Sequence, residues 1–289
     1  MRLRVLVGVL TAVLSAVNAG FLRPPSSLPR INTNFGANST NDTSADCIPG
    51  VLPNSGINFF QQRLNHSDPD SNATFSQKYF WSNATWGGPG YPVILMTPGE
   101  QAMDVGFCDF LTNISVQWQM ASAVQAAIVL IEHRYYGDSS PFQTLTTETL
   151  QHLTLHNAIH DLTYFASTVR LPFDKNGSSN SPVAPWILSG GSYSGALAAW
   201  TARLAPDVFW AYHASSAPVQ TIYNYWQYFE PIQQGMPSNC SRDLTAIVEY
   251  VDNATLSLPP EALHAFKDQW GLASIENAID FASYVSISW

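Results

Sequence analysis

Residues 186–195 read Trp-Ile-Leu-Ser-Gly-Gly-Ser-Tyr-Ser-Gly. The apolar residues that open this stretch are typical of a buried strand, and the Ala- and Leu-rich residues 196–204 that follow predict a helix. Glycine and serine between the two allow a strand and a helix to meet in a sharp turn. Residues 186–204 therefore predict a single strand–turn–helix unit.

The surrounding sequence repeats this kind of strand. Wholly apolar runs at 91–96 and 126–131 match the run at 186–188, and residues 208–214 can form a further strand. Strands that are apolar on both faces are typical of a parallel sheet. The alternating, aromatic residues 74–81 predict a strand in an antiparallel edge region.

Helical periodicity lies between these strands. Apolar residues recur at spacings of three and four from Leu150 and Leu153 to Val169, which predicts a helix that faces the core. Strands that alternate with helices give an α/β fold class with a mostly parallel sheet. After Pro218 the character changes to aromatic residues and helical spacing, with a Pro259-Pro260 break, so residues 221–289 predict the start of a helical insertion or cap.

Composition excludes several classes of protein. The chain has 289 residues, 46% of them hydrophobic, which is enough for a core and rules out bulk disorder. Twelve Lys and Arg stand against 21 Asp and Glu, for a net charge of −9, which argues against a nucleic-acid surface. No group of His, Cys and Asp has the spacing of metal ligands, so we predict neither a metal nor a cofactor.

The N-terminal sequence predicts secretion. Two arginines precede the apolar run 5–17 and small residues end at Ala19, as in a signal peptide at 1–19. The alternative, a membrane anchor, needs about 20 apolar residues, so we predict no membrane association after cleavage. Residues 20–55 are rich in Pro, Ser and Asn and predict a leader or linker.

Glycosylation sequons support the same location. Nine Asn-X-Ser/Thr sequons occur, and we predict glycan acceptors at Asn38, Asn41, Asn65, Asn72, Asn83, Asn113, Asn176, Asn239 and Asn253. The prediction is a secreted protein, or one in an acidic compartment of the lysosomal or vacuolar type.

The turn at 189–195 has the pattern of a nucleophile elbow. Such a turn lifts one hydroxyl above the edge of the sheet, which makes Ser192 the candidate catalytic nucleophile. The backbone N–H groups of Tyr193 and Gly99 are the candidate oxyanion hole, although the Gly99 loop by itself is more typical of an ordinary turn. The usual pattern G-x-S-x-G ends here in Ser194, which is small enough for the turn to survive. The alternative is a glycine-rich turn with a packing role alone.

Three histidines are candidates for the catalytic base. Glu132-His133-Arg134-Tyr135-Tyr136 follows the strand at 126–131, and we interpret it as a structural ion-pair and aromatic cluster, because the acid and the histidine follow the serine in this fold. His213, in a strand, and His264, in an amphipathic helix, follow Ser192. Packing within the protein or at its surface is the expected role of both.

Several motifs together resemble one family. They are EHRYYG at 132–137 with Ser140-Pro141-Phe142, GGSYSG at 190–195 with Ala198-Ala199-Trp200, SSAP at 215–218, and FQQRLNH at 60–66. They resemble the serine peptidase family of lysosomal Pro-Xaa carboxypeptidase and dipeptidyl peptidase II, and most of all its secreted fungal members. The resemblance extends from about Gly56 to the end of the chain.

This resemblance implies a function and a domain plan. It implies that residues 56–219 are the N-terminal part of an α/β-hydrolase domain, and that residues 220–289 are the start of a helical cap inserted into that domain. It also implies that Ser192 is the nucleophile and that Gly99-Glu100 lies near the oxyanion hole. The implied substrates are proline-containing peptides or proteins, cleaved after proline. Carboxypeptidase or dipeptidyl peptidase action is the expectation, and endopeptidase action stays open.

The chain also departs from the family. The family's Asp and His lie beyond the cap, whereas this sequence stops at Trp289, so we expect an N-terminal portion of a peptidase that is inactive alone and lacks the last strands of the sheet. Cys47, Cys108 and Cys240 are expected to enter disulfides, with the pairing open. Two alternatives remain, a lipase or esterase of the same fold and a non-catalytic secreted glycoprotein. The oligomeric state is open.

Overall fold

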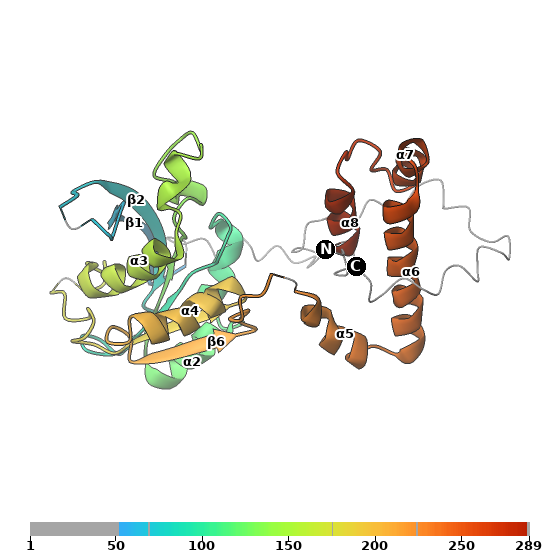
Figure 1. Cartoon of the computed structure of the whole chain (residues 1–289). Coiled ribbons are helices and arrows are strands. Elements are labelled where there is room, and N and C mark those ends of the chain that lie inside the picture. The colour runs from blue at the N-terminus through green and yellow to red at the C-terminus, as the bar shows by residue number, and fades with distance from the viewer. Residues whose placement is uncertain (1–51, 69, 175, 224, 288–289) are drawn as a thin grey trace. The chain divides into compact units, whose positions relative to one another are not determined.

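The computed structural model describes residues 52–68, 70–174, 176–223 and 225–287 (Figure 1). The predicted signal peptide, nearly all of the leader, Cys47, and the sequons at Asn38 and Asn41 lie outside these residues. The chain divides between Thr221 and Ile222 into two compact units. Each unit is described by itself.

The larger unit is built on a six-stranded sheet. Its strands are β1 (Ser55–Arg63), β2 (Thr74–Ser82), β3 (Val93–Met96), β4 (Ala127–Ile131), β5 (Trp186–Gly191) and β6 (Ala211–Ser215). They lie in the order β1-β2-β4-β3-β5-β6. Strands β4, β3, β5 and β6 are parallel, while β2 pairs antiparallel with β1 and β4. The α/β class, the mostly parallel sheet and the antiparallel strand predicted at 74–81, which is β2, are confirmed.

Helices cover both faces of this sheet. Alternate residues of β3 point to opposite sides, so that Val93 and Leu95 join one core while Ile94 and Met96 join the other. The first core includes residues of α3 (Leu155–Thr168) and α4 (Tyr193–Leu204). The second includes residues of the 3-10 helix η2 (Val105–Leu111) and of α2 (Val116–Val124). Burial on both faces explains why the central strands are apolar throughout.

Helix α3 begins later than its apolar spacing suggested. Thr154 caps it, because its side chain accepts a hydrogen bond from the backbone N–H of Asn157, and the helix starts at Leu155. Leu150 and Leu153, which we predicted to face the core, are exposed. Leu150 lies in the separate 3-10 turn η4 (Thr149–His152), and Leu153 directly follows that turn. The two leucines therefore continue the apolar spacing of α3, although neither of them belongs to that helix.

The regular elements of the smaller unit, among the residues described, are all helices. This unit contains the 3-10 helix η5 (Trp226–Phe229), α5 (Glu230–Gly235), α6 (Ser238–Ser257), α7 (Pro260–Asp268) and α8 (Ala278–Ile287). Val251, Phe266 and Phe281 from three of these helices form its core. Within the described part of the chain, no helix is both long and apolar enough to span a membrane.

Candidate active site

Ser192 occupies the turn between β5 and α4. Its backbone has φ 55° and ψ −128°, a conformation that L-residues rarely adopt, and its side chain is exposed. Strand β5 ends at Gly191 and helix α4 begins at Tyr193, so a single residue connects the two elements. This is the strained, exposed position that a nucleophile elbow gives its serine.

Two glycines allow the strand and the helix to approach. A Cβ at Gly190 would lie 2.1 Å from the backbone oxygen of Ser194, and one at Gly195 would lie 2.7 Å from the backbone oxygen of Ser215. Gly191, by contrast, has open space around it. Ser194, which stands where the usual pattern has glycine, is buried in this turn. The turn therefore forms with serine at 194, while glycine is required at 190 and 195.

The loop after β3 lies beside this turn. Met96 of β3 is the parallel partner of Ser189 of β5, so the residues after both strands emerge at the same edge of the sheet. Gly99 has φ 89°, and a Cβ built on it would lie 3.3 Å from the hydroxyl oxygen of Ser194. A left-handed, buried glycine at this place brings backbone close to the start of α4. The oxyanion role of its N–H group stays a prediction.

The start of α4 supplies the second candidate oxyanion group. The first N–H groups of an α-helix have no partner within the helix and carry partial positive charge. Tyr193 is the first residue of α4 and directly follows Ser192. Its backbone N–H therefore directly follows the serine in the chain, in a field that favours negative charge.

His133 contacts the side chain of Tyr193. Its Nε2 lies 3.0 Å from the Tyr193 hydroxyl, and its Nδ1 lies 2.9 Å from the backbone oxygen of Arg134. The histidine is buried, and this burial lowers its pKa. The sequence assigned His133 to a structural cluster, and these contacts agree with that assignment.

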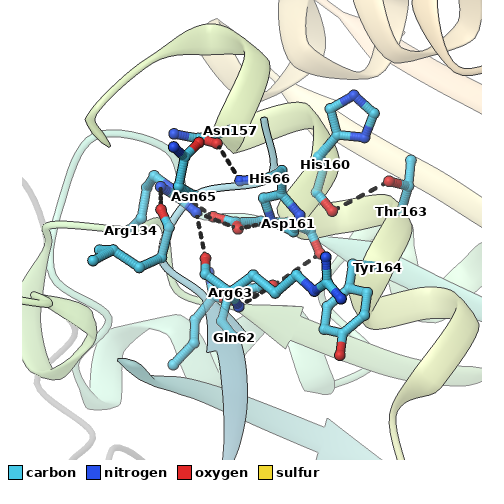
Figure 2. Close-up of polar contacts among 12 residues, drawn as sticks. Gln62, Arg63, Asn65, His66, Arg134, Asn157, His160, Asp161, Thr163 and Tyr164 are labelled. Carbon is cyan, nitrogen blue, oxygen red and sulfur yellow. Dashed lines mark hydrogen bonds and ion pairs between the residues drawn. The ribbon is translucent and has the colours of Figure 1, made fainter. Parts of the chain in front are cut away.

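Arg134, the next residue, is the centre of a buried polar network (Figure 2). Its Nε and Nη2 donate to the two carboxylate oxygens of Asp161, each at 2.6 Å. Its remaining N–H groups donate to the backbone oxygens of Arg63, Leu64 and His152. All five guanidinium N–H groups therefore have acceptors, which is the condition under which a fully buried arginine is tolerated.

Other buried side chains extend this network to the neighbouring strands. His66 Nε2 lies 2.8 Å from Asp161, and Gln62 Nε2 donates to Gln77 at 2.9 Å and to the Asp161 backbone oxygen at 3.1 Å. Gln77 in turn donates to the backbone oxygen of Glu132 at 2.8 Å. The sequence did not identify Asp161. The sequence feature that could have identified Asp161 is its charge on the apolar face of α3, three residues after Ala158 and four before Phe165.

Glu132 and Gly137 complete the EHRYYG motif. The Glu132 carboxylate is fully buried and accepts from the Met103 backbone N–H at 2.6 Å and from the Ser139 hydroxyl at 2.7 Å. A Cβ at Gly137 would lie 2.1 Å from this carboxylate, so glycine is required there. The motif thus fixes the chain after β4, and with it His133.

The two histidines that follow Ser192 in the sequence do not hydrogen-bond to it among the described residues. His213 Nδ1 is 3.0 Å from the hydroxyl of Ser189, which also accepts from Gln117 at 3.2 Å. His264 is exposed on α7. Packed and surface roles were expected for them. Among the residues that the structure describes, no histidine forms a hydrogen bond with Ser192 Oγ.

Sequons and cysteines can be located where they are described. Asn72, Asn113, Asn176, Asn239 and Asn253 are exposed, and Asn65 and Asn83 are half-buried. Cys108 is buried and Cys240 is exposed. Glycosylation and disulfide formation stay predictions. No group of three or more His, Cys, Asp or Glu that could hold a metal occurs in the described part of the chain.

The fold and this turn define a class. A mostly parallel sheet with an exposed, strained serine between β5 and the following helix is an α/β-hydrolase architecture. Residues 62–260 match the model of the family described as serine carboxypeptidase S28, and the chain belongs to this family. It is therefore a member of a serine peptidase family, as the motifs indicated.

Relatives agree with this assignment. The chain is 44% identical over 250 residues to the serine protease vicPa of Bipolaris victoriae (strain FI3), covering 84% of this chain and 46% of that protein. It is 34% identical over 220 residues to a probable extracellular serine carboxypeptidase of Arthroderma benhamiae, covering 76% and 30%. It is 32% identical over 198 residues to the human lysosomal Pro-X carboxypeptidase, covering 68% and 37%. The chain thus spans less than half the length of each of these relatives.

Proposed function

We propose that this chain carries the nucleophile of a secreted serine peptidase that cleaves peptide bonds after proline. The observation that carries the proposal is the position of Ser192, exposed at φ 55° between β5 and α4 in a chain of the S28 family. Membership of the S28 family supports the activity of a serine peptidase. The specificity, the location and the roles of individual residues are inferred.

The proposed reaction proceeds through an acyl-enzyme. Ser192 Oγ attacks the carbonyl carbon of the scissile bond and gives up its proton to a base, and the negative charge that develops on the carbonyl oxygen is stabilised by the N–H groups of Tyr193 and Gly99. The carbon–nitrogen bond breaks as the amine takes up that proton. Water then hydrolyses the ester and regenerates Ser192. The proposal assigns the base and its acid partner to residues of the protein outside those described.

Cleavage after proline is supported by the relatives. The name of one relative specifies Pro-X carboxypeptidase activity, and that of another an extracellular serine carboxypeptidase. We infer exopeptidase action on proline-containing peptides, of the carboxypeptidase or dipeptidyl peptidase type. The helical residues 222–287 are the proposed start of a cap domain.

Secretion, or delivery to an acidic compartment, is supported independently. The sequence begins with a predicted signal peptide, and five predicted glycan acceptors among the described residues are exposed. One relative is named extracellular and another lysosomal. Both locations suit a glycoprotein with a net negative charge.

The test compares the hydrolysis of two substrates, with and without the hydroxyl of Ser192. The protein that carries this chain is assayed at acid pH with a prolyl nitroanilide and with a nitrophenyl ester. A peptidase turns over the anilide, and Ser192→Ala lowers kcat on the order of a millionfold. Ser167→Ala is the matched control, because that hydroxyl donates to the backbone of α3 at Thr163. An enzyme that hydrolyses the ester alone would instead be an esterase.

A further inference from the structure

The contact between His133 and Tyr193 joins the end of β4 to the start of α4. His133 follows β4 by two residues, and Tyr193 is the first residue of α4. Nε2 of the histidine and the tyrosine hydroxyl are 3.0 Å apart, although the two residues are 60 positions apart in the sequence. Both rings are at least partly buried, and the Tyr136 ring packs edge-on against His133 with centroids 5.6 Å apart.

The partners of His133 determine its tautomer. The Arg134 backbone oxygen can only accept, so Nδ1 carries the hydrogen in the 2.9 Å contact. In the neutral ring, Nε2 is then an acceptor, and the Tyr193 hydroxyl donates to it. Burial raises the pKa of Tyr193 to about 12, so the hydroxyl keeps its hydrogen. Burial also lowers the pKa of His133, which favours the neutral ring.

Charged groups surround this pair from several elements. The hydrogen bond to the Arg134 backbone oxygen raises the pKa of His133, as do Asp161 on α3 and Glu100 in the loop after β3, whereas the Arg134 charge lowers it. Burial outweighs that hydrogen bond and both carboxylates in setting the direction of the shift. Glu100, whose charge acts on both His133 and Tyr193, directly follows Gly99 in the loop that carries the candidate oxyanion glycine.

We propose that His133 is a positioning residue for the oxyanion hole, which it fixes by accepting a hydrogen bond from the side chain of Tyr193. The Tyr193 side chain and its backbone N–H belong to one residue at the first position of α4, so a fixed side chain restricts the direction of that N–H. EHRYYG anchors His133 through Glu132 and Arg134. This inference rests on the proposed function, in which Ser192 is the nucleophile.

The test measures how fast a fluorophosphonate probe modifies Ser192. Tyr193→Phe removes the donor and keeps the ring, and His133→Leu removes the acceptor. Each lowers the maximal inactivation rate by about 10- to 100-fold with the probe's binding constant unchanged, because only the geometry of the reacting step is disturbed. His133→Gln restores much of the rate, because its amide oxygen can take the place of Nε2.

Two controls separate positioning from stability. Trp200→Leu alters a partly buried residue of the same helix and the same small core, and it should lower the melting temperature without lowering the inactivation rate. In the double variant with Tyr193→Phe and His133→Leu, the rate should equal that of either single variant, because both changes remove one interaction. Tyr193→Phe is the mildest change and keeps the test valid if His133→Leu does not fold.

The outcomes are distinct. A wild-type inactivation rate in Tyr193→Phe, or losses that multiply in the double variant, would overturn the positioning role of His133 while leaving Ser192 as the nucleophile. Absence of the adduct from Ser192 in the wild-type protein would overturn the proposed function itself.

Discussion

The backbone N–H of Ser192 donates a hydrogen bond of 2.9 Å to the backbone oxygen of Ser215. Ser215 is the last residue of β6, and Ser192 directly follows the neighbouring strand β5. This bond ties the strained turn to the adjacent strand, so the backbone at Ser192 is held from outside its own segment. Such support is what a residue in a rarely populated conformation requires.

The close approach at this turn gives a first prediction. Gly190→Ala should destabilise the protein by about 1–3 kcal/mol or more, because the new Cβ would lie 2.1 Å from the backbone oxygen of Ser194 and the backbone must shift. It should also abolish probe labelling of Ser192. Urea unfolding and labelling of the same sample measure the two effects.

Gly191→Ala is the matched control for this prediction. It lies next to Gly190 in the same turn, and an added Cβ there meets no atom within 4 Å. Its unfolding midpoint should stay near that of the wild type. Equal stability of the two alanine variants would show that the turn is not packed as described.

The oxyanion assignment of Gly99 gives a second prediction. Gly99→Ala strains a residue with φ 89° and pushes against Ser194, so the N–H group moves and the turnover falls by about 10²- to 10³-fold. Gly90→Ala has nearly the same strain at φ 84° but open space around it. Steady-state kinetics on the prolyl anilide should separate the two, and similar losses in both would contradict the oxyanion role.

The buried pair of Arg134 and Asp161 gives a third prediction. Asp161→Ala should cost about 3–5 kcal/mol of unfolding free energy, because it leaves a fully buried guanidinium without its counterion. Asp138→Ala removes the partner of Lys78 from a pair in which Asp138 is 66% exposed, and it should cost less than about 1 kcal/mol. Chemical denaturation of both variants measures the two losses of unfolding free energy. A loss in Asp161→Ala as small as that in Asp138→Ala would mean that the network of Figure 2 contributes little to stability.

Asp252 in the helical unit gives a fourth prediction, for the pH dependence of stability. Burial and the nearby Glu249 raise the pKa of Asp252 from 3.8 to about 6, and its Oδ2 is buried with no hydrogen-bond partner among the described residues. Between these two pH values the folded state holds the proton more tightly than the unfolded state. Stability from this group should therefore fall as the pH rises from about 4 to about 6 and change little above that.

The variant Asp252→Asn tests the direction of this pH dependence of stability. Thermal melts between pH 4 and pH 7 should show a weaker decline than in the wild type. Asp243→Asn, an exposed residue of the same helix α6, should leave the wild-type decline unchanged. A wild-type melting temperature that rises over this pH range, with Asp252→Asn flat, would contradict the assignment.

The central sheet was predictable because its strands are apolar on both faces. Residues 93–96, 127–131 and 186–188 meet that condition, and each lies in a strand. Strand β1 was not predicted, because Gln61, Gln62 and Arg63 interrupt its apolar character. The buried Gln62 bonds to Gln77 and to the Asp161 backbone, contacts 15 and 99 residues away that local patterns do not encode.

The site was predictable in part. The turn at Ser192 and Tyr193 followed from the strand–turn–helix pattern, and the loop of Gly99 from its place after a strand. The structure brings this loop to the start of α4, while the catalytic roles of the three residues stay predictions. The pairing of His133 with Tyr193 was not predicted, because it spans 60 residues and depends on the register of β4 beside β3 and of β3 beside β5. Asp161 is not predictable from local pattern, because it lies among the apolar residues of the buried face of α3.

Labelling of Ser192 tests the account most directly. The protein carrying this chain is treated with a fluorophosphonate, digested, and analysed by mass spectrometry, with the Ser192→Ala variant treated in parallel. We predict one adduct, on the peptide that contains Ser192, and its loss in the variant. An adduct on another residue, or equal labelling of the variant, would contradict the claim that Ser192 is the nucleophile of this peptidase.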